Sequence, residues 1–225
     1  MIALIGAMDV EINALVQKLE NKEEINVLAY KFYKGILNNK EVVILKSGIG
    51  KVASAVGCAL MIDHFKPSVV INTGIAGGLN GLKQYDILLA SELSYSDVDA
   101  TNFGYKLGQV PQMPEVYKAD EIYLNKIKDF FNKNNISYKS GNVLSSDSFI
   151  VSESQLLIKR DGFVGCEMEG ASIAQTCYIN KTPFVSIRFI SDVVGGSNQA
   201  ESYMEFETKA ANLSQDICYK VLEVI

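Results

Sequence analysis

Histidine and paired cysteines, the side chains that hold most protein metals, are nearly missing from this sequence. Its 225 residues include one histidine, His64, and four widely spaced cysteines without a Cys-x-x-Cys motif. A zinc site needs about four such ligands, so the sequence predicts no metal. A Ser-His or Cys-His nucleophile pair is excluded unless His64 reaches a site. We expect His64 near a helix C-terminus, where it stabilises the last carbonyl groups.

Positive charge and long hydrophobic runs are also scarce. The net charge is −5 and the pI is near 5.0, whereas binding to a nucleic-acid backbone needs a basic face. No apolar stretch approaches the roughly 20 residues that span a bilayer, and no basic segment precedes the apolar residues 2–5. We therefore expect no nucleic-acid partner, no membrane span and no signal peptide. The cysteines lie in apolar surroundings, which is typical of buried thiols in a cytoplasmic protein.

What remains is the composition of an ordinary globular protein, with 48% hydrophobic and 21% charged residues. A chain of this length can bury a sizeable core within one domain. No repeat, low-complexity tract or linker divides it, so we predict a single α/β domain over residues 1–225.

The mostly apolar segment 183–192 gives the clearest structural signal. It predicts a strand that is buried on both faces, with Ser191 and Asp192 at its C-terminal end and Gly195 and Gly196 shortly after. Open α/β sheets bind ligands at the carboxyl ends of their strands, which makes Asp192 a candidate functional carboxylate. Capping of a turn or helix is the structural alternative.

The N-terminal segment has the same layout. Residues 2–5 predict a short strand, 6–8 a tight turn and 9–20 a helix. Glu11 then lies in the first helical turn, directly after a strand tip. Favourable pairing with the helix dipole would explain this glutamate without any function, so a catalytic role stays open at this point.

Two glycine-rich segments follow predicted strands. Residues 47–51 precede a predicted helix over 51–65 and do not match a Walker A loop. Residues 48–53 fit the dinucleotide-binding pattern G-x-G-x-x-A, but the next predicted strand does not end in the acidic residue that would bind the ribose. Backbone N–H groups at such a helix start suit a polar ligand. Residues 72–78, with three glycines in five positions, are predicted as a ligand-lining loop after the strand 68–72.

The remaining segments alternate strand and helix signals. Hairpin strands are predicted over 27–36 and 41–47, further strands over 86–91 and 142–146, helices over 120–133 and 202–223, and a long lid or interface loop over 95–114. Phe149 and Ile150 follow a strand tip, where they would hold a flat heterocycle or pack in the core. Glu167 and Glu169 form a pair of carboxylates among apolar neighbours at a strand-to-helix transition.

Five of these segments resemble one enzyme family. They are residues 6–11, 46–51, 72–78, 167–169 and 188–192. Their sequences, order and spacing resemble the bacterial 5′-methylthioadenosine/S-adenosylhomocysteine nucleosidases, which belong to the nucleoside phosphorylase superfamily. One such motif would be weak, whereas five in order along nearly the whole chain are specific.

The resemblance implies a homodimer of three-layer α/β sandwiches, each built around a mixed, barrel-like central sheet. It implies hydrolysis, without metal or cofactor, of the adenine–ribose bond in small adenosine thioethers. Asp192 would be the general acid toward N7 of adenine, and Glu11 would position and deprotonate the attacking water. Adenine leaves poorly unless it is protonated and water is a poor nucleophile, so one acid and one base suit this reaction.

The resemblance also implies a substrate-binding set around the ribose. Glu169 would hold the ribose hydroxyls, alongside Met168 and Arg188. Further substrate-binding positions implied by the motifs are Met8, Ile49, Ala76, Gly77 and Ser191.

Aromatic residues complete the implied site. Phe149 would stack on the purine, and backbone groups of Ile150 would bind its Watson–Crick edge. Tyr203 would close the alkylthio pocket. Phe103 and the loop 111–114 would reach across the dimer into the site of the partner subunit.

Two positions depart from the family pattern. Ile75 stands where many members have serine, which removes a hydroxyl contact but leaves the backbone N–H, and Ser96 replaces a histidine often seen in the long loop. Neither concerns the implied acid, base or ribose ligand.

Three other functions fit parts of this pattern. A nucleoside phosphorylase would need a cationic phosphate clamp, but the chain has only two arginines, and Glu11 would repel phosphate by about 4 kcal/mol at a separation of about 4 Å. A dinucleotide-dependent oxidoreductase rests on the pattern over 48–53 alone. A non-catalytic adenosine-binding protein would not need three site carboxylates. The preference among methylthioadenosine, S-adenosylhomocysteine, 5′-deoxyadenosine and aminodeoxyfutalosine stays open at this stage.

Overall fold

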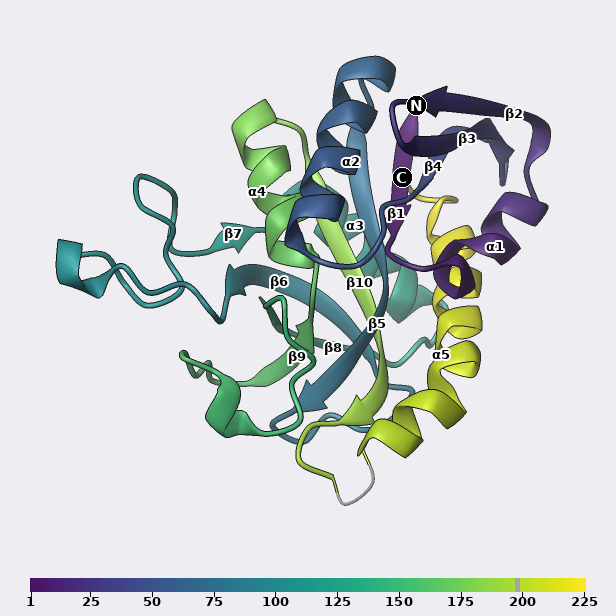
Figure 1. Cartoon of the computed structure of the whole chain (residues 1–225). Helices are drawn as coiled ribbons and strands as arrows, with labels where there is room; N and C mark the ends of the chain where they lie inside the picture. Colours follow the sequence, from purple (N-terminus) through teal and green to yellow (C-terminus); the bar gives the residue numbers. More distant parts are fainter. Residues whose placement is uncertain (197–198) are drawn as a thin grey trace.

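A mixed β-sheet lies between two layers of helices in the computed structural model, which describes residues 1–196 and 199–225 (Figure 1). The strands are β1 (Ile2–Gly6), β2 (Glu20–Val27), β3 (Tyr30–Leu37), β4 (Lys40–Lys46), β5 (Val69–Leu79), β6 (Ile87–Tyr95), β7 (Tyr117–Lys118), β8 (Lys139–Ser145), β9 (Phe163–Glu167) and β10 (Phe184–Val193). The α-helices are α1 (Asp9–Gln17), α2 (Lys51–Phe65), α3 (Glu121–Lys133), α4 (Gly170–Asn180) and α5 (Gln199–Val221). Within the described ranges, no helix is both long and apolar enough to cross a membrane.

Five of the strands close into a barrel. They follow the order β10, β6, β8, β9 and β5, and β5 pairs again with β10. The strands β1, β4, β3 and β2 extend the sheet outward from β5, and both parallel and antiparallel pairs occur. The predicted fold, three α/β layers around a mixed, barrel-like sheet, is confirmed.

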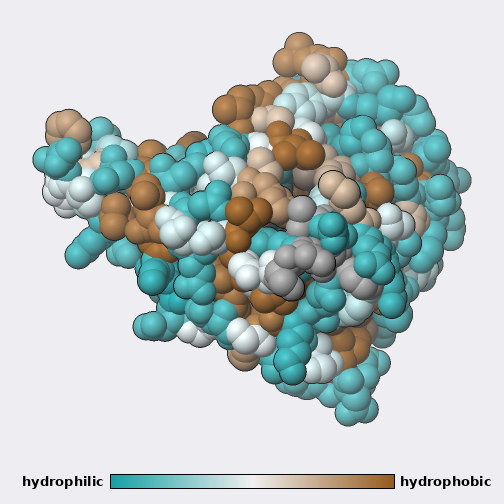
Figure 2. All heavy atoms as spheres, turned by 60° about the horizontal axis from the view of Figure 1, so that its bottom comes forward, coloured by the Kyte–Doolittle hydropathy of each residue, from teal (hydrophilic) through white to brown (hydrophobic). Residues whose placement is uncertain are grey.

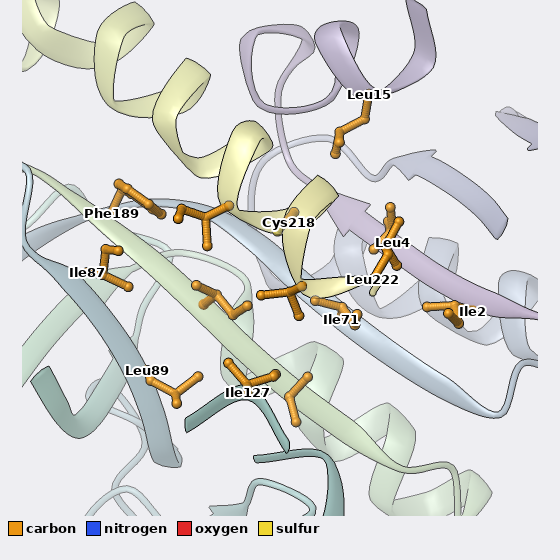
Figure 3. Close-up of a cluster of buried hydrophobic side chains, with 14 of the residues drawn as sticks. Ile2, Leu4, Leu15, Ile71, Ile87, Leu89, Ile127, Phe189, Cys218 and Leu222 are labelled. Carbon is orange, nitrogen blue, oxygen red and sulfur yellow. The ribbon is translucent and has the colours of Figure 1, made fainter. Parts of the chain in front are cut away.

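Alternating side chains of the central strands build a core on each face of the sheet. In β1, Ile2 and Leu4 face one core while Ala3 and Ile5 face the other. The first core lies beneath α1, α3 and α5, and Figure 3 shows Leu4 close to Leu222, the residue after α5. The second core lies beneath α2 and α4. Complete burial of one such aliphatic side chain stabilises the fold by about 1.5–3 kcal/mol.

The glycine-rich segment 72–78, predicted as a loop, belongs to the strand β5. Its backbone pairs with β10 up to Gly78 and with β9 from Gly77 to Leu79, so its polar groups are satisfied within the sheet. The glycines allow close packing instead, because a Cβ on Gly78 would lie 2.8 Å from Cβ of Leu82. The loop prediction was wrong because glycine marks close approach in strands as well as turns.

Strand β2 was not predicted from the sequence. It is largely exposed, rich in charged residues and paired with β3 alone at the edge of the sheet. Edge strands of this kind carry little hydrophobic alternation. The adjacent helix was consequently predicted too long, since α1 ends at Gln17 rather than at residue 20.

Residues 96–116, between β6 and β7, project as an arm from the body of the molecule (Figure 1). A 3₁₀ turn, η1 (Thr101–Phe103), lies at its far end, where Phe103 is 82% exposed. The arm corresponds to the segment that was predicted as a lid or an interface.

Candidate active site

One pocket gathers most of the predicted site. It lies near the C-terminal ends of β1, β5, β9 and β10, beside the starts of α1 and α4. The predicted residues that line it are Met8, Glu11, Ile49, Ala76, Gly77, Phe149, Met168, Glu169, Ser191, Asp192 and Tyr203. Ile150 lines a small adjoining cavity together with Gly77, Phe149 and Asp192. These distant segments meet because β1, β5 and β10 run parallel to one another, and because the antiparallel pairing of β9 with β5 places Cys166, which precedes Glu167, opposite Gly77.

Glu11 is a buried carboxylate that the backbone holds from two sides. The N–H groups of Ala7 and Met8, in the turn after β1, donate to its Oε2 at 2.7 and 3.1 Å. The N–H of Ile75 in β5 donates to its Oε1 at 3.0 Å, so the isoleucine that replaces serine still supplies its backbone donor. Burial raises the pKa of Glu11, against the opposing effects of the Arg188 charge and these three hydrogen bonds. The side chain is thus fixed in position, and its raised pKa makes it a stronger proton acceptor than an exposed glutamate.

Asp192 lies near the C-terminal end of β10, opposite Gly77 of β5, and is 1% exposed. The Ser191 hydroxyl donates to its Oδ1 at 2.6 Å, and Nε2 of Gln199 donates to its Oδ2 at 2.7 Å. Burial raises the pKa of Asp192, while the two hydrogen bonds act in the opposite direction. A carboxyl group with a raised pKa retains its proton more readily than an exposed aspartate does, which suits a general acid.

Glu169 caps the start of α4 and reaches the start of α2. The N–H of Gly50, which has φ +95°, donates to its Oε1 at 2.9 Å. Burial, together with the nearby charge of Glu167, raises the pKa of Glu169 to about 8. Residues 47–51 were predicted to offer backbone N–H groups to a polar ligand. In the structure, one of these groups, the N–H of Gly50, binds a carboxylate of the protein itself.

Glu167 organises the turn between β9 and α4 rather than opening into solvent. Its Oε2 accepts from the N–H groups of Glu169 at 2.9 Å and Gly170 at 2.7 Å, and the Ser145 hydroxyl donates to its Oε1. Nη2 of Arg188 lies 2.6 Å from the same Oε2. Breaking such a buried pair by removing one partner costs about 3–5 kcal/mol.

Arg188 and Phe103 are the two predicted binding residues that line neither of these cavities. Arg188 is 1% exposed and lies behind the pocket wall, where it donates to Asn72 as well as to Glu167. Its predicted contact with the ribose stays a prediction, and its position indicates that it acts on the site through Glu167. Sequence reasoning missed Asn72 in this pair because a strand-end asparagine has many structural uses.

An aromatic and thioether wall closes one side of the pocket. The rings of Phe149 and Tyr203 meet edge to face with centroids 5.4 Å apart. The Tyr203 hydroxyl lies 3.7 Å from Sδ of Met8. This wall offers apolar and sulfur contacts to a flat or thioether-containing ligand.

The described residues contain no group of three His, Cys, Asp or Glu side chains that could hold a metal. His64 lies in the last turn of α2, with Nδ1 3.0 Å from the carbonyl oxygen of Leu60. Ser96, the first residue of the arm, is buried, and its N–H donates to the Ser145 carbonyl oxygen at 2.9 Å.

A sequence model of the phosphorylase superfamily matches residues 1–223 of this chain. Curated relatives include the 5′-methylthioadenosine/S-adenosylhomocysteine nucleosidases of Staphylococcus haemolyticus, 44% identical over 100% of both chains, and Staphylococcus carnosus, 41% identical over 99% of both. Among solved structures, the Neisseria meningitidis nucleosidase in complex with methylthio-immucillin-A has a TM-score of 0.93, with 37% identity over 100% of this chain and 99% of that one. The Colwellia psychrerythraea nucleosidase in complex with adenine has a TM-score of 0.88, with 34% identity over 99% and 94%.

The chain therefore belongs to the 5′-methylthioadenosine/S-adenosylhomocysteine nucleosidase family of that superfamily. The resemblance inferred from five short motifs is confirmed, and so is the expectation that the chain is an enzyme of this class.

Proposed function

We propose that the protein is an N-ribosyl hydrolase that cleaves 5′-methylthioadenosine and S-adenosylhomocysteine to adenine and the corresponding 5-thioribose product. Full-length identity to nucleosidases supports the activity. The convergence of Glu11, Glu169 and Asp192 on one pocket supports the chemistry.

The spacing of the two proposed catalytic carboxylates carries the mechanism. A Cβ on Gly77 would lie 3.2 Å from Oδ2 of Asp192, and a Cβ on Gly74 would overlap the Glu11 carboxylate. Both carboxyl groups therefore adjoin β5, beside glycines three residues apart, and both line the same pocket. Inverting glycosidases likewise use an acid and a base on opposite sides of the scissile bond, which leaves room for the sugar and a water.

The reaction follows from this placement. Asp192 donates its proton to N7 of adenine as the bond from the base to C1′ breaks, so that the base leaves neutral. A water held by Glu11 attacks C1′ and transfers a proton to this carboxylate, and Glu169 holds the ribose hydroxyls. Both carboxyl groups regain their starting protonation by exchange with solvent. A positioned acid or base contributes about 10²–10⁴-fold each.

Hydrolysis is favoured over phosphorolysis because the pocket has no cationic phosphate clamp. No lysine, arginine or histidine is among its lining residues within the described part of the chain. Arg188 is bound to Glu167, and Arg160 pairs with Glu115 at 3.3 Å. The carboxylate of Glu11 occupies the position from which a nucleophile would approach, and it would repel phosphate.

The exposed apolar surface supports a homodimer. Helices α2 and α4 lie side by side (Figure 1) and expose Val52 at 75%, Tyr178 at 55% and Ile179 at 57%. Hydrophobic residues also gather on and beside the projecting arm at the left of Figure 2. A second copy would cover this face, and Phe103 would then close the partner's pocket, as its sequence position implies.

The cytoplasm is the proposed compartment. The four cysteines are free and buried, as expected of thiols that remain reduced.

The decisive experiment measures adenine release from 5′-methylthioadenosine with and without phosphate, using the wild type and Asp192→Asn. We expect phosphate-independent release of adenine and free thioribose, with a loss of about 10²–10⁴-fold in the variant. A requirement for phosphate with formation of a ribose 1-phosphate would place the protein among phosphorylases. Absence of release from both proposed substrates would contradict the nucleosidase assignment.

A further inference from the structure

Gln199, the first residue of α5, places its carboxamide against the proposed acid. Its Nε2 donates to Oδ2 of Asp192 at 2.7 Å and to the carbonyl oxygen of Ile150 at 2.8 Å. Its Oε1 accepts from the N–H of Gly195 at 3.0 Å. The side chain is 7% exposed and lines the small cavity that also includes Phe149. Both hydrogens of the amide nitrogen are thus used by two acceptors of the site.

These acceptors are the ones assigned above to two different edges of adenine. Asp192 faces N7, on the Hoogsteen edge, and Ile150 faces the Watson–Crick edge. The exocyclic amino group N6 is the one substituent of adenine that belongs to both edges. An NH₂ group that bridges Asp192 and Ile150 therefore occupies the position that N6 must take when the base is bound.

We propose that Gln199 is an internal stand-in for the base, which satisfies Asp192 and Ile150 in the empty site and which adenine must displace. This inference rests on the proposed function, since it requires that the base binds between these two residues. A primary carboxamide offers the same NH₂ donor as adenine N6, and the two cannot occupy the same acceptors together. Gln199 therefore acts as a positioning residue that limits affinity for the base.

The exchange serves two physical purposes. A buried carboxylate oxygen without a hydrogen-bond donor is costly, so Gln199 stabilises Oδ2 of Asp192 when the site is empty. After bond cleavage the same carboxamide can return as adenine leaves, which favours product release. The price is a lower apparent affinity, because ligand binds only to the fraction of molecules in which the acceptors are free.

Two variants separate this role from simple support of Asp192. Gln199→Leu keeps the size of the side chain but cannot donate, and Gln199→Ala removes it. Glu201→Ala, an exposed position in the same first turn of α5, is the matched control. The measurements are the dissociation constant of adenine by calorimetry, kcat and KM for 5′-methylthioadenosine, and the melting temperature of each variant.

We expect both Gln199 variants to bind adenine more tightly and to lower KM, each by about tenfold if about one molecule in ten of the wild type has free acceptors. Glu201→Ala should match the wild type. Weaker adenine binding, or a loss confined to kcat, would overturn the proposal and show that Gln199 holds Asp192 in the bound state. A folded wild type that neither binds nor releases adenine would instead refute the proposed function itself.

Discussion

Gly74 is the position at which the smallest change should disable the site. It has φ +149°, and an added Cβ would overlap the Glu11 carboxylate and lie 2.8 Å from Nη1 of Arg188. Neither neighbour can withdraw, because three backbone N–H groups hold Glu11 and Glu167 holds Arg188. Alanine at this position should therefore displace the proposed base from the site of water attack.

The expected magnitude combines strain with the loss of the base. An unfavourable backbone conformation costs about 1–3 kcal/mol, and in a protein of this size about 1 kcal/mol lowers the melting temperature by about 2–4 °C. Displacement of the base should lower kcat by about 10²–10⁴-fold. Adenine binding should change little, since the residues proposed to contact the base, Asp192, Phe149 and Ile150, lie elsewhere in the site.

Gly81→Ala is the control for Gly74→Ala. Gly81 also has a positive φ, +89°, but an added Cβ there meets no atom within 4 Å. It shares the backbone strain and lacks the collision, so the difference between the variants measures the contact with Glu11 and Arg188. Steady-state kinetics, adenine calorimetry and thermal melting provide the comparison. If Gly74→Ala kept kcat within about threefold of Gly81→Ala, the reasoning about a rigidly held base would be refuted.

Three further predictions follow from the site and the exposed surface. Because the pKa of Asp192 is raised and the acid must be protonated, kcat/KM should fall as pH rises through that pKa; a flat alkaline profile would contradict the acid assignment. The pKa of Glu169 is raised from 4.5 to about 8, so between these pH values the folded state binds more protons than the unfolded state, and stability should decrease as pH rises. The melting temperature of Glu169→Gln should decrease less steeply with pH. An equally steep decrease in the variant would exclude this contribution of Glu169. Val52→Glu on α2 should shift the protein from dimer to monomer in sedimentation experiments, whereas Phe103→Ala should raise KM and leave the dimer intact. An unchanged mass for Val52→Glu, or an unchanged KM for Phe103→Ala, would argue against the proposed interface.

Local patterns in the sequence predicted the elements whose hydrophobic and polar residues alternate clearly. Helix α2 has the predicted bounds 51–65, and the hairpin of β3 and β4 turns at Asn38 and Asn39, both with positive φ. Strand β2 was missed because its pairing depends on β3 and not on its own side chains. The segment 72–78 was misassigned because only its partners β9 and β10 reveal that it is extended.

The carboxylates of the site could be anticipated because each stands at a strand tip or a helix start. Their supporting contacts could not. Gln199 reaches Asp192 through tertiary structure, and Asn72 meets Arg188 across two strands distant in sequence. Such buried networks depend on which side chains a closed sheet brings into contact, and the spacing of residues within one segment of the sequence does not reveal those contacts.

The barrel strand β5 has a consequence for substrate range. Asp192 lies beside Gly77 and Glu11 beside Gly74, so a short length of β5 main chain would lie against both the leaving base and the incoming water. This main chain would face the part that all adenosine thioethers have in common, the adenine-to-C1′ unit. Variation among these nucleosides lies beyond the 5′ carbon, where the proposed binding mode places the side chains of Met8 and Tyr203. On that binding mode, adaptable side chains would permit different 5′ groups, whereas the fixed main chain at the other end of the pocket would select the base.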